Sequence, residues 1–209
     1  MALVCGLLLV YLRGCSDMDI LVHGFNVKDP NATVGKLHPY LDEPFVFNYG
    51  WFSLISVLLY NKREAKRLKI VTSAYDGSTI YAHSNGAAIA VESARQGAKI
   101  KLLICINPAL KCKTVFPESI ERVIVIYTKH DRPTKAARFF DKVPFIQLLV
   151  PNSWGAMGAK GAKLTDERVF NWDLSDRLDG HSDFFKEDCI EGLMVDLKKI
   201  INQQSCPKG

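Results

Sequence analysis

The sequence predicts an α/β fold, with a mainly parallel twisted sheet flanked by helices. Short apolar runs, several of them rich in β-branched residues, alternate with segments of helical periodicity. This alternation indicates right-handed crossover connections. No linker rich in glycine or serine divides the 209 residues, and 48% of them are hydrophobic. We therefore expect a single domain over residues 1–209.

The first quarter of the chain contains two expected strands, each followed by a helix. Residues 19–22 form a short apolar strand, which a loop and a helix at about 33–42 follow. Residues 44–48 predict the next strand. From residue 51 to 68 apolar side chains recur at helical spacing, and the segment ends in lysine and arginine, as suits a helix C-terminus.

The middle of the chain continues the same pattern. Residues 79–83 predict a strand and residues 86–96 a helix of small residues, which Gly97 ends as a left-handed cap would. Residues 100–106 form another apolar strand. Residues 122–127 are strongly β-branched and indicate a buried parallel strand, and 168–173 predict a shorter one. The strands are therefore expected to be joined through helices rather than hairpins.

Ser84 stands where the strand at 79–83 turns into the following helix. Ala82 and Gly86 flank it at a distance of two residues, and both are small. Small residues are needed there in a nucleophile elbow, a turn so tight that larger side chains would collide with backbone. The turn would hold the hydroxyl clear of the sheet, facing the free N–H groups of the helix. A plain turn with a helix-capping serine is the alternative.

A second turn of interest follows the strand at 19–22. Gly24, after His23, would let the backbone turn so that the N–H of Phe25 faces Ser84. Together with the N–H of Asn85 it would form an oxyanion hole, two backbone donors for a developing negative charge. An ordinary turn between a strand and a helix is the alternative here.

An acid and a base follow Ser84 in the chain. Asp131 lies just past the strand at 122–127, where it can orient an imidazole, and His181 follows the strand at 168–173. The order Ser84, Asp131, His181 is that of one of the known serine triads. Asp173 is the alternative acid. Among the other histidines, His130 is the rival base, while His83 is expected to point away from the nucleophile because neighbours on a strand alternate.

These residues together resemble the α/β-hydrolase superfamily, closest to its lipase and esterase-like branch. The resemblance spans roughly residues 19–203, and Ala82 departs from the glycine usual in the family. It implies a serine hydrolase that cleaves carboxylic esters through an acyl-enzyme, with Ser84, His181 and Asp131 as the triad. A thioesterase, amidase or acyltransferase on the same triad stays open, as does a non-catalytic binding module on this scaffold.

Residues 151–165 form an unusual glycine-rich segment between the acid and the base. It contains Trp154 and Met157, two large apolar side chains that would contact an acyl group if the segment were a mobile flap over Ser84. The alternative is an irregular surface loop in which Trp154 packs on the core.

Composition excludes several classes of function. The net charge of +5 is spread along the chain without interleaved aromatic residues, so no nucleic-acid partner is expected. The six cysteines have no metal-ligand spacing, so we expect no metal and no cofactor. The expected partner is a small-molecule or lipid-like ester substrate.

The N-terminal residues 2–12 form an apolar run with no basic residue before it. The run is too short to span a bilayer, so no stable membrane span is expected. An extra strand or a helix covering the sheet is the favoured interpretation, which makes a cytoplasmic protein the expectation. Secretion or lipid anchoring through this run stays open.

Overall fold

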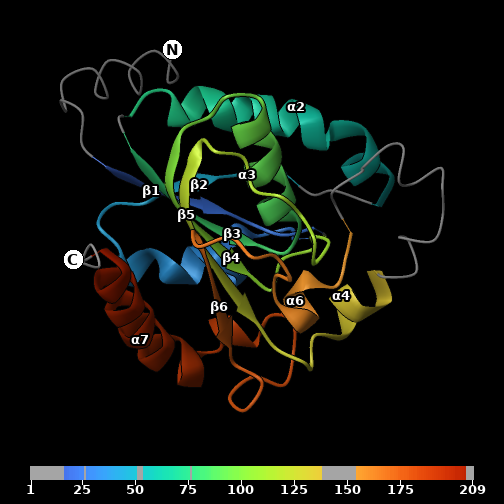
Figure 1. The fold of residues 1–209 in the computed structure, drawn as a ribbon, viewed down its shortest axis with the longest axis vertical. Helices are drawn as coiled ribbons and strands as arrows, with labels where there is room; N and C mark the ends of the chain where they lie inside the picture. Colours follow the sequence, from blue (N-terminus) through green and yellow to red (C-terminus); the bar gives the residue numbers. More distant parts are fainter. Residues whose placement is uncertain (1–16, 26, 51–53, 76, 138–153, 206–209) are drawn as a thin grey trace.

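A computed structural model describes residues 17–25, 27–50, 54–75, 77–137 and 154–205. Six strands form one sheet in the order β2-β1-β3-β4-β5-β6, and every neighbouring pair is parallel (Figure 1). Their bounds are β1 Met18–Val22, β2 Phe45–Phe47, β3 Ser78–His83, β4 Ile100–Ile106, β5 Ile120–Tyr127 and β6 Val169–Asp173. The predicted mainly parallel sheet is confirmed.

Helices cover both faces of this sheet. The α-helices are α2 Leu54–Thr72, α3 Asn85–Arg95, α4 Arg132–Ala137, α6 Met157–Lys160 and α7 Glu187–Ser205, and the 3₁₀ helices are η1 Pro30–Ala32, η2 Val34–Tyr40 and η4 Asp183–Phe185. In Figure 1, α2 and α3 lie together on one side of the sheet, and α7 lies on the other. The helix expected at 33–42 is a 3₁₀ helix that contains Pro39, whose ring would clash with the carbonyl four residues earlier in an α-helix.

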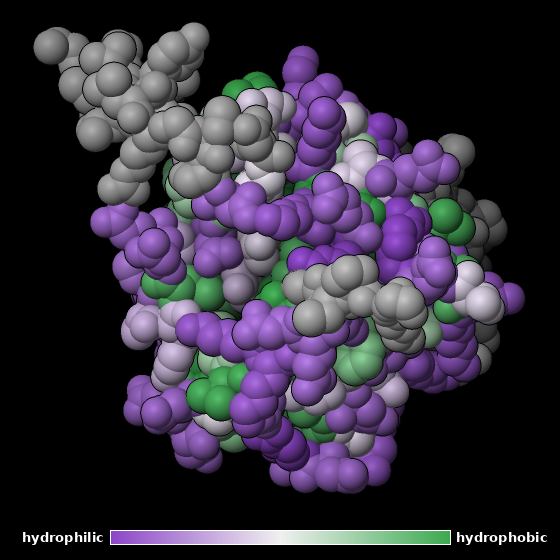
Figure 2. Space-filling view, turned by 60° about the vertical axis from the view of Figure 1, so that its left-hand side comes forward, coloured by the Kyte–Doolittle hydropathy of each residue, from purple (hydrophilic) through white to green (hydrophobic). Residues whose placement is uncertain are grey.

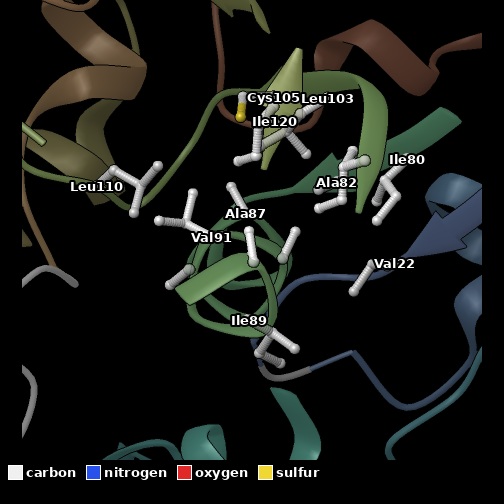
Figure 3. Packing of buried hydrophobic residues seen from close by; sticks show 14 of the residues in the cluster. Val22, Ile80, Ala82, Ala87, Ile89, Val91, Leu103, Cys105, Leu110 and Ile120 are labelled. Carbon is white, nitrogen blue, oxygen red and sulfur yellow. The ribbon is translucent and has the colours of Figure 1, made fainter. Parts of the chain in front are cut away.

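Two apolar clusters fill the space between the helices and the sheet. One joins α2 and α3 to the sheet, and the other joins η2, η4 and α7 to its opposite face. Figure 3 shows small side chains of α3, among them Ala87 and Val91, facing the sheet in the first cluster. Their size lets α3 lie close to β3 and β4, which fixes the start of this helix relative to the strand ends.

The strand order places a crevice at the carboxyl ends of β1 and β3. The chain leaves β1 for β2 at the sheet edge and then returns to the other side of β1 for β3. Connections that diverge from neighbouring strands leave a crevice beyond the strand ends, where α/β proteins bind ligands. His23 follows β1 and Ser84 follows β3, so both lie at this point of the sheet.

The surface gives little further indication of function. The face in Figure 2 is mostly hydrophilic, with apolar side chains in small separate areas. None of the helices within the described ranges is long and apolar enough to cross a bilayer. The apolar run at 2–12 lies outside the described residues, so its interpretation stays a prediction.

Candidate active site

Ser84 occupies a strained turn between β3 and α3. Its φ of 52° and ψ of −117° are sparsely populated for a residue other than glycine, and such strain persists only where the surroundings impose it. The Ser84 N–H donates to the Ile106 carbonyl at 3.0 Å, and the Ser84 carbonyl accepts from Ala87 at 3.2 Å and Ala109 at 3.1 Å. Backbone hydrogen bonds on both sides therefore hold the turn.

The turn has no room for a side chain at Gly86. A Cβ at Gly86 would lie 2.5 Å from the Val22 carbonyl oxygen and 2.6 Å from that of His23, closer than a real Cβ approaches backbone. Ala82, in the middle of the sheet, is fully buried. The fold therefore accommodates alanine at residue 82, whereas residue 86 must be glycine because the backbone after β1 lies so close to it.

The turn after β1 is held by a buried pair of aromatic rings. His23 stacks on Tyr49 with 3.9 Å between ring centroids. The Nδ1–H of His23 donates to the Gly24 carbonyl oxygen at 2.9 Å, while Nε2 accepts from the Tyr49 N–H at 3.3 Å. The Tyr49 hydroxyl lies 2.9 Å from the His23 carbonyl and 2.8 Å from that of Gly24. Burial lowers the pKa of His23, in keeping with this neutral bonding pattern.

Gly24 brings this turn directly against the nucleophile. A Cβ on Gly24 would lie 3.0 Å from the Ser84 Cβ, so the two turns are in contact. Phe25 follows, and both Phe25 and Asn85 line the same pocket as Ser84. Asn85 is the first residue of α3, and its N–H has no acceptor within the helix. Its side chain is held by Asn61 through two hydrogen bonds of 2.9 and 3.1 Å.

Asp131 and His181 form a hydrogen-bonded pair at the other side of the pocket. The His181 Nδ1 lies 2.8 Å from Oδ2 of Asp131, which is fully buried. The other carboxylate oxygen accepts from the Thr134 N–H at 3.0 Å, as a helix cap for α4. With Nδ1 donating to the carboxylate, Nε2 of His181 is the ring nitrogen available as a base.

The alternative residues lie elsewhere. Asp173 accepts hydrogen bonds from the Ser175 N–H at 2.8 Å, from the Ser175 hydroxyl and from the Tyr127 hydroxyl, so it closes the turn after β6. His130 is not among the residues that line the pocket. The structure therefore brings together Asp131 and His181, and it does not bring either alternative to Ser84.

The pocket has a volume of about 340 Å³ and is lined by both turns and by His181. Its apolar wall includes Phe25, Val27, Ala109 and Trp154. The Trp154 ring meets the Phe25 ring edge-on at 5.4 Å between centroids, and the main-chain N–H of Trp154 donates to the Ala109 carbonyl oxygen at 2.7 Å. Such a mixture of apolar walls and a few polar groups is typical of a site for a small ligand.

In the glycine-rich segment, Met157 does not lie where an acyl group could contact it, contrary to the prediction. This side chain is fully buried in the cluster that contains α3, and it does not line the pocket. Its N–H donates to Leu110 at 2.9 Å, and the N–H of Gly158 donates to Pro108 at 2.9 Å, which ties the segment to the loop after β4. Residues 151–153 lie outside the described part, so a moving flap over 151–165 stays a prediction.

The position of His83 also differs from the prediction that this side chain points away from the nucleophile. It lines the pocket, and its ring centroid is 4.8 Å from that of His181. Strand alternation fails as a guide here because the chain leaves β3 at the elbow immediately after His83. Within the described ranges no group of three His, Cys, Asp or Glu side chains could hold a metal ion.

Comparisons with known proteins show similarity in structure but none in sequence. No family model matches the chain, and no curated protein matches its sequence. Solved structures do match. A serine hydrolase involved in carbazole degradation is 11% identical with a TM-score of 0.57, and the alignment covers 91% of this chain and 92% of that one. The chain has the α/β-hydrolase fold.

Two further structures show the same fold at similar distance. An esterase of Pyrococcus furiosus is 13% identical with a TM-score of 0.50, over 91% of this chain and 82% of that chain. A serine hydrolase of Cycloclasticus zankles is 10% identical with a TM-score of 0.50, over 91% and 92%. In this chain the α/β-hydrolase fold brings the carboxyl ends of β1, β3 and β5 to one edge, where the turns described above converge.

Proposed function

We propose that the protein is a serine hydrolase that cleaves carboxylic esters through an acyl-enzyme. The observation that supports this most directly is the 2.8 Å contact between Asp131 and His181 at the pocket that also holds Ser84 on its strained turn. A buried carboxylate, an oriented imidazole and a presented hydroxyl are the three parts that nucleophilic acyl transfer requires.

The reaction begins with attack by Ser84. Its Oγ bonds to the ester carbonyl carbon while the hydroxyl proton passes to Nε2 of His181, and Asp131 stabilises the resulting imidazolium. The carbon–oxygen bond to the alcohol then breaks, and the alcohol leaves with that proton. Water repeats the sequence on the acyl-enzyme: His181 accepts a proton from it, the acid is released and the proton returns to Ser84.

The negative charge on the carbonyl oxygen needs donors that are in place before the reaction. We assign this role to the backbone N–H groups of Phe25 and Asn85, because both residues line the pocket beside Ser84. Contact between Gly24 and Ser84 supports the assignment, because Phe25 directly follows Gly24 in the chain.

The substrate is proposed to be a small ester with a short apolar acyl group. A volume of about 340 Å³ with a largely apolar wall suits such a group better than a polymer or a polar headgroup. The structural neighbours described as an esterase and as serine hydrolases agree with this class of reaction.

A fluorophosphonate probe tests the proposal. We expect covalent labelling of the folded protein at Ser84, detected by peptide mass, and no labelling of Ser84→Ala. A panel of p-nitrophenyl esters, a thioester and an anilide with the same acyl group then ranks the reactions. Faster turnover of the thioester or the anilide would identify the protein as a thioesterase or an amidase. The absence of labelling at Ser84 would reject the hydrolase and favour a non-catalytic binding module.

A further inference from the structure

Two buried side chains converge on the main-chain carbonyl of His181. The Nε2 of His83 lies 3.2 Å from this oxygen, and the Nδ2 of Asn107 lies 3.0 Å from it. The same amide nitrogen lies 3.4 Å from the carbonyl of Gly180. Both side chains are nearly or fully buried, at 3% exposure for His83 and 0% for Asn107. Buried contacts of this kind are not the product of chance surface packing.

The partners determine which atoms carry hydrogen. A carbonyl oxygen only accepts, so Nε2 of His83 must be the protonated ring nitrogen and Nδ2 of Asn107 the donor. The other polar atoms of the two side chains, His83 Nδ1 and Asn107 Oδ1, have no hydrogen-bond partner in the described part of the chain. Each residue is thus kept buried at a cost in stability, and its side-chain hydrogen bonds are directed at the His181 loop.

The loop that carries His181 is anchored before the histidine by the Thr128 hydroxyl, which donates to the Leu178 carbonyl at 2.7 Å, and it is closed around the histidine by the Asp183 N–H, 3.4 Å from the Gly180 carbonyl. His181 lies between β6 and η4, outside any regular element, so no helix or strand sets its backbone. The ring is held at one end by Asp131, 50 residues away in sequence. His83 and Asn107 come from the ends of β3 and β4, 98 and 74 residues away, and hold the main-chain carbonyl of His181 rather than its ring.

We propose that His83 and Asn107 are positioning residues, whose N–H donors fix the His181 carbonyl so that Asp131 and the backbone together set the direction of the catalytic ring. This proposal rests on the proposed function, because His181 is a base only in that reaction. Neither residue touches the reacting atoms through these bonds. They act by removing freedom from the loop that presents His181.

The neutral form of His83 is part of this role. Burial lowers the pKa of His83 well below its usual value, and the nearby His181 and His23 lower it further. His83 therefore stays uncharged while His181 becomes an imidazolium at a ring separation of 4.8 Å. A charged side chain in its place would oppose that step, so a neutral donor is the residue type that the position requires.

A matched pair of substitutions tests the donor. His83→Leu removes it at similar volume, and His83→Gln keeps an N–H near the position of Nε2. We expect His83→Leu to lower kcat and the rate of Ser84 labelling by about 10- to 100-fold with little change in KM, since a displacement near 1 Å can cost about 100-fold. His83→Gln should recover most of the loss. Asn107→Gly tests the other donor, because its φ of 45° suits glycine.

Proton NMR of the histidine rings tests the proposal without relying on hydrolysis. We expect a low-field Nδ1–H signal from His181, assigned by its loss in Asp131→Asn and its retention in His38→Gln, which alters an exposed histidine. In folded His83→Leu or Asn107→Gly this signal should broaden or shift. An unchanged signal, or equal kcat losses in folded His83→Leu and His83→Gln, would overturn the positioning role. A responding signal without labelling of wild-type Ser84 would support positioning and reject the hydrolase.

Discussion

The two sides of the pocket are built by different means. On the nucleophile side, Ser84 is held by backbone: its own strained dihedral angles, three main-chain hydrogen bonds and the absence of a side chain at Gly86. On the acid–base side, His181 lies in a loop, and side chains from distant parts of the sequence hold its ring and its carbonyl. Main-chain contacts hold the nucleophile side, and side-chain hydrogen bonds across the sheet hold the acid–base side.

This difference has a consequence for how each side responds to change. A strained turn held by packed backbone is sensitive to added volume but needs no particular polar neighbour. A loop residue held by hydrogen bonds is sensitive to the loss of a donor or acceptor, even where shape is kept. Substitutions that change volume and substitutions that change bonding should therefore separate the two sides.

The largest expected effect tests whether Ser84 and His181, on opposite sides of the pocket, act together in catalysis. Ser84→Ala and His181→Ala should each lower kcat by about 10⁶-fold, and the double variant should lose no more than either alone, because proton transfer requires both groups. Steady-state kinetics with a p-nitrophenyl ester gives the three values. Losses that multiply in the double variant would mean that the two residues act independently, and the pocket would then hold no working pair.

The next largest effect concerns bonding on the acid–base side. Asp131→Asn should lower kcat by about 10⁴-fold with the fold kept, since the amide favours the wrong tautomer of His181. Asp173→Asn is the matched control, because this carboxylate also follows a strand but binds Ser175 and Tyr127. We expect it to change kcat less than threefold. A larger loss in Asp173→Asn than in Asp131→Asn would reverse the assignment.

The same contrast explains what the sequence could predict. Ser84 is recognisable because its requirements lie within five residues, namely a strand, two small flanking residues and a helix. The choice between Asp131 and Asp173 stayed open because both follow strands, and only the assembled sheet shows which carboxylate faces the His181 loop. Side-chain bonds across 50 to 98 residues have no local pattern.

His83 and Asn107 show where a usable signal was present. Each is a polar residue at the end of an apolar strand, and β3 and β4 are neighbours in the sheet. Two such residues at the carboxyl ends of adjacent parallel strands share one edge, the edge where the loops converge. Met157 illustrates the opposite case: the sequence predicts that it contacts an acyl group, but the glycines beside it let residues 155–158 pack closely on the loop after β4, and its side chain is buried.

A smaller effect tests volume on the nucleophile side. Gly86→Ala should lower the free energy of unfolding by about 1–3 kcal/mol, because the added Cβ would press on two carbonyl oxygens of β1 and its turn. Gly192→Ala in α7 is the control: outside the backbone of its own helix, the nearest atom to an added Cβ is in the Arg177 side chain at 3.7 Å, so alanine should raise the free energy of unfolding by about 0.5–1 kcal/mol.

Urea denaturation measures both Gly86→Ala and Gly192→Ala. Equal stability of the two variants would mean that the contact of α3 with β1 is loose. The requirement for glycine at residue 86, and with it the contrast between the two sides of the pocket, would then have to be abandoned.

The smallest effect concerns the wall that the two sides share. Trp154 contacts Phe25 from the nucleophile side and lines the pocket with His181. If it contacts the acyl group, Trp154→Ala should lower kcat/KM more for hexanoate and octanoate esters than for acetate, by at most about 1–3 kcal/mol. Phe170→Ala on β6 is the control, since this ring is 38% exposed and lies outside the pocket lining. Equal losses at every chain length would show that Trp154 supports Phe25 rather than substrate, and the pocket would then select its acyl group through other walls.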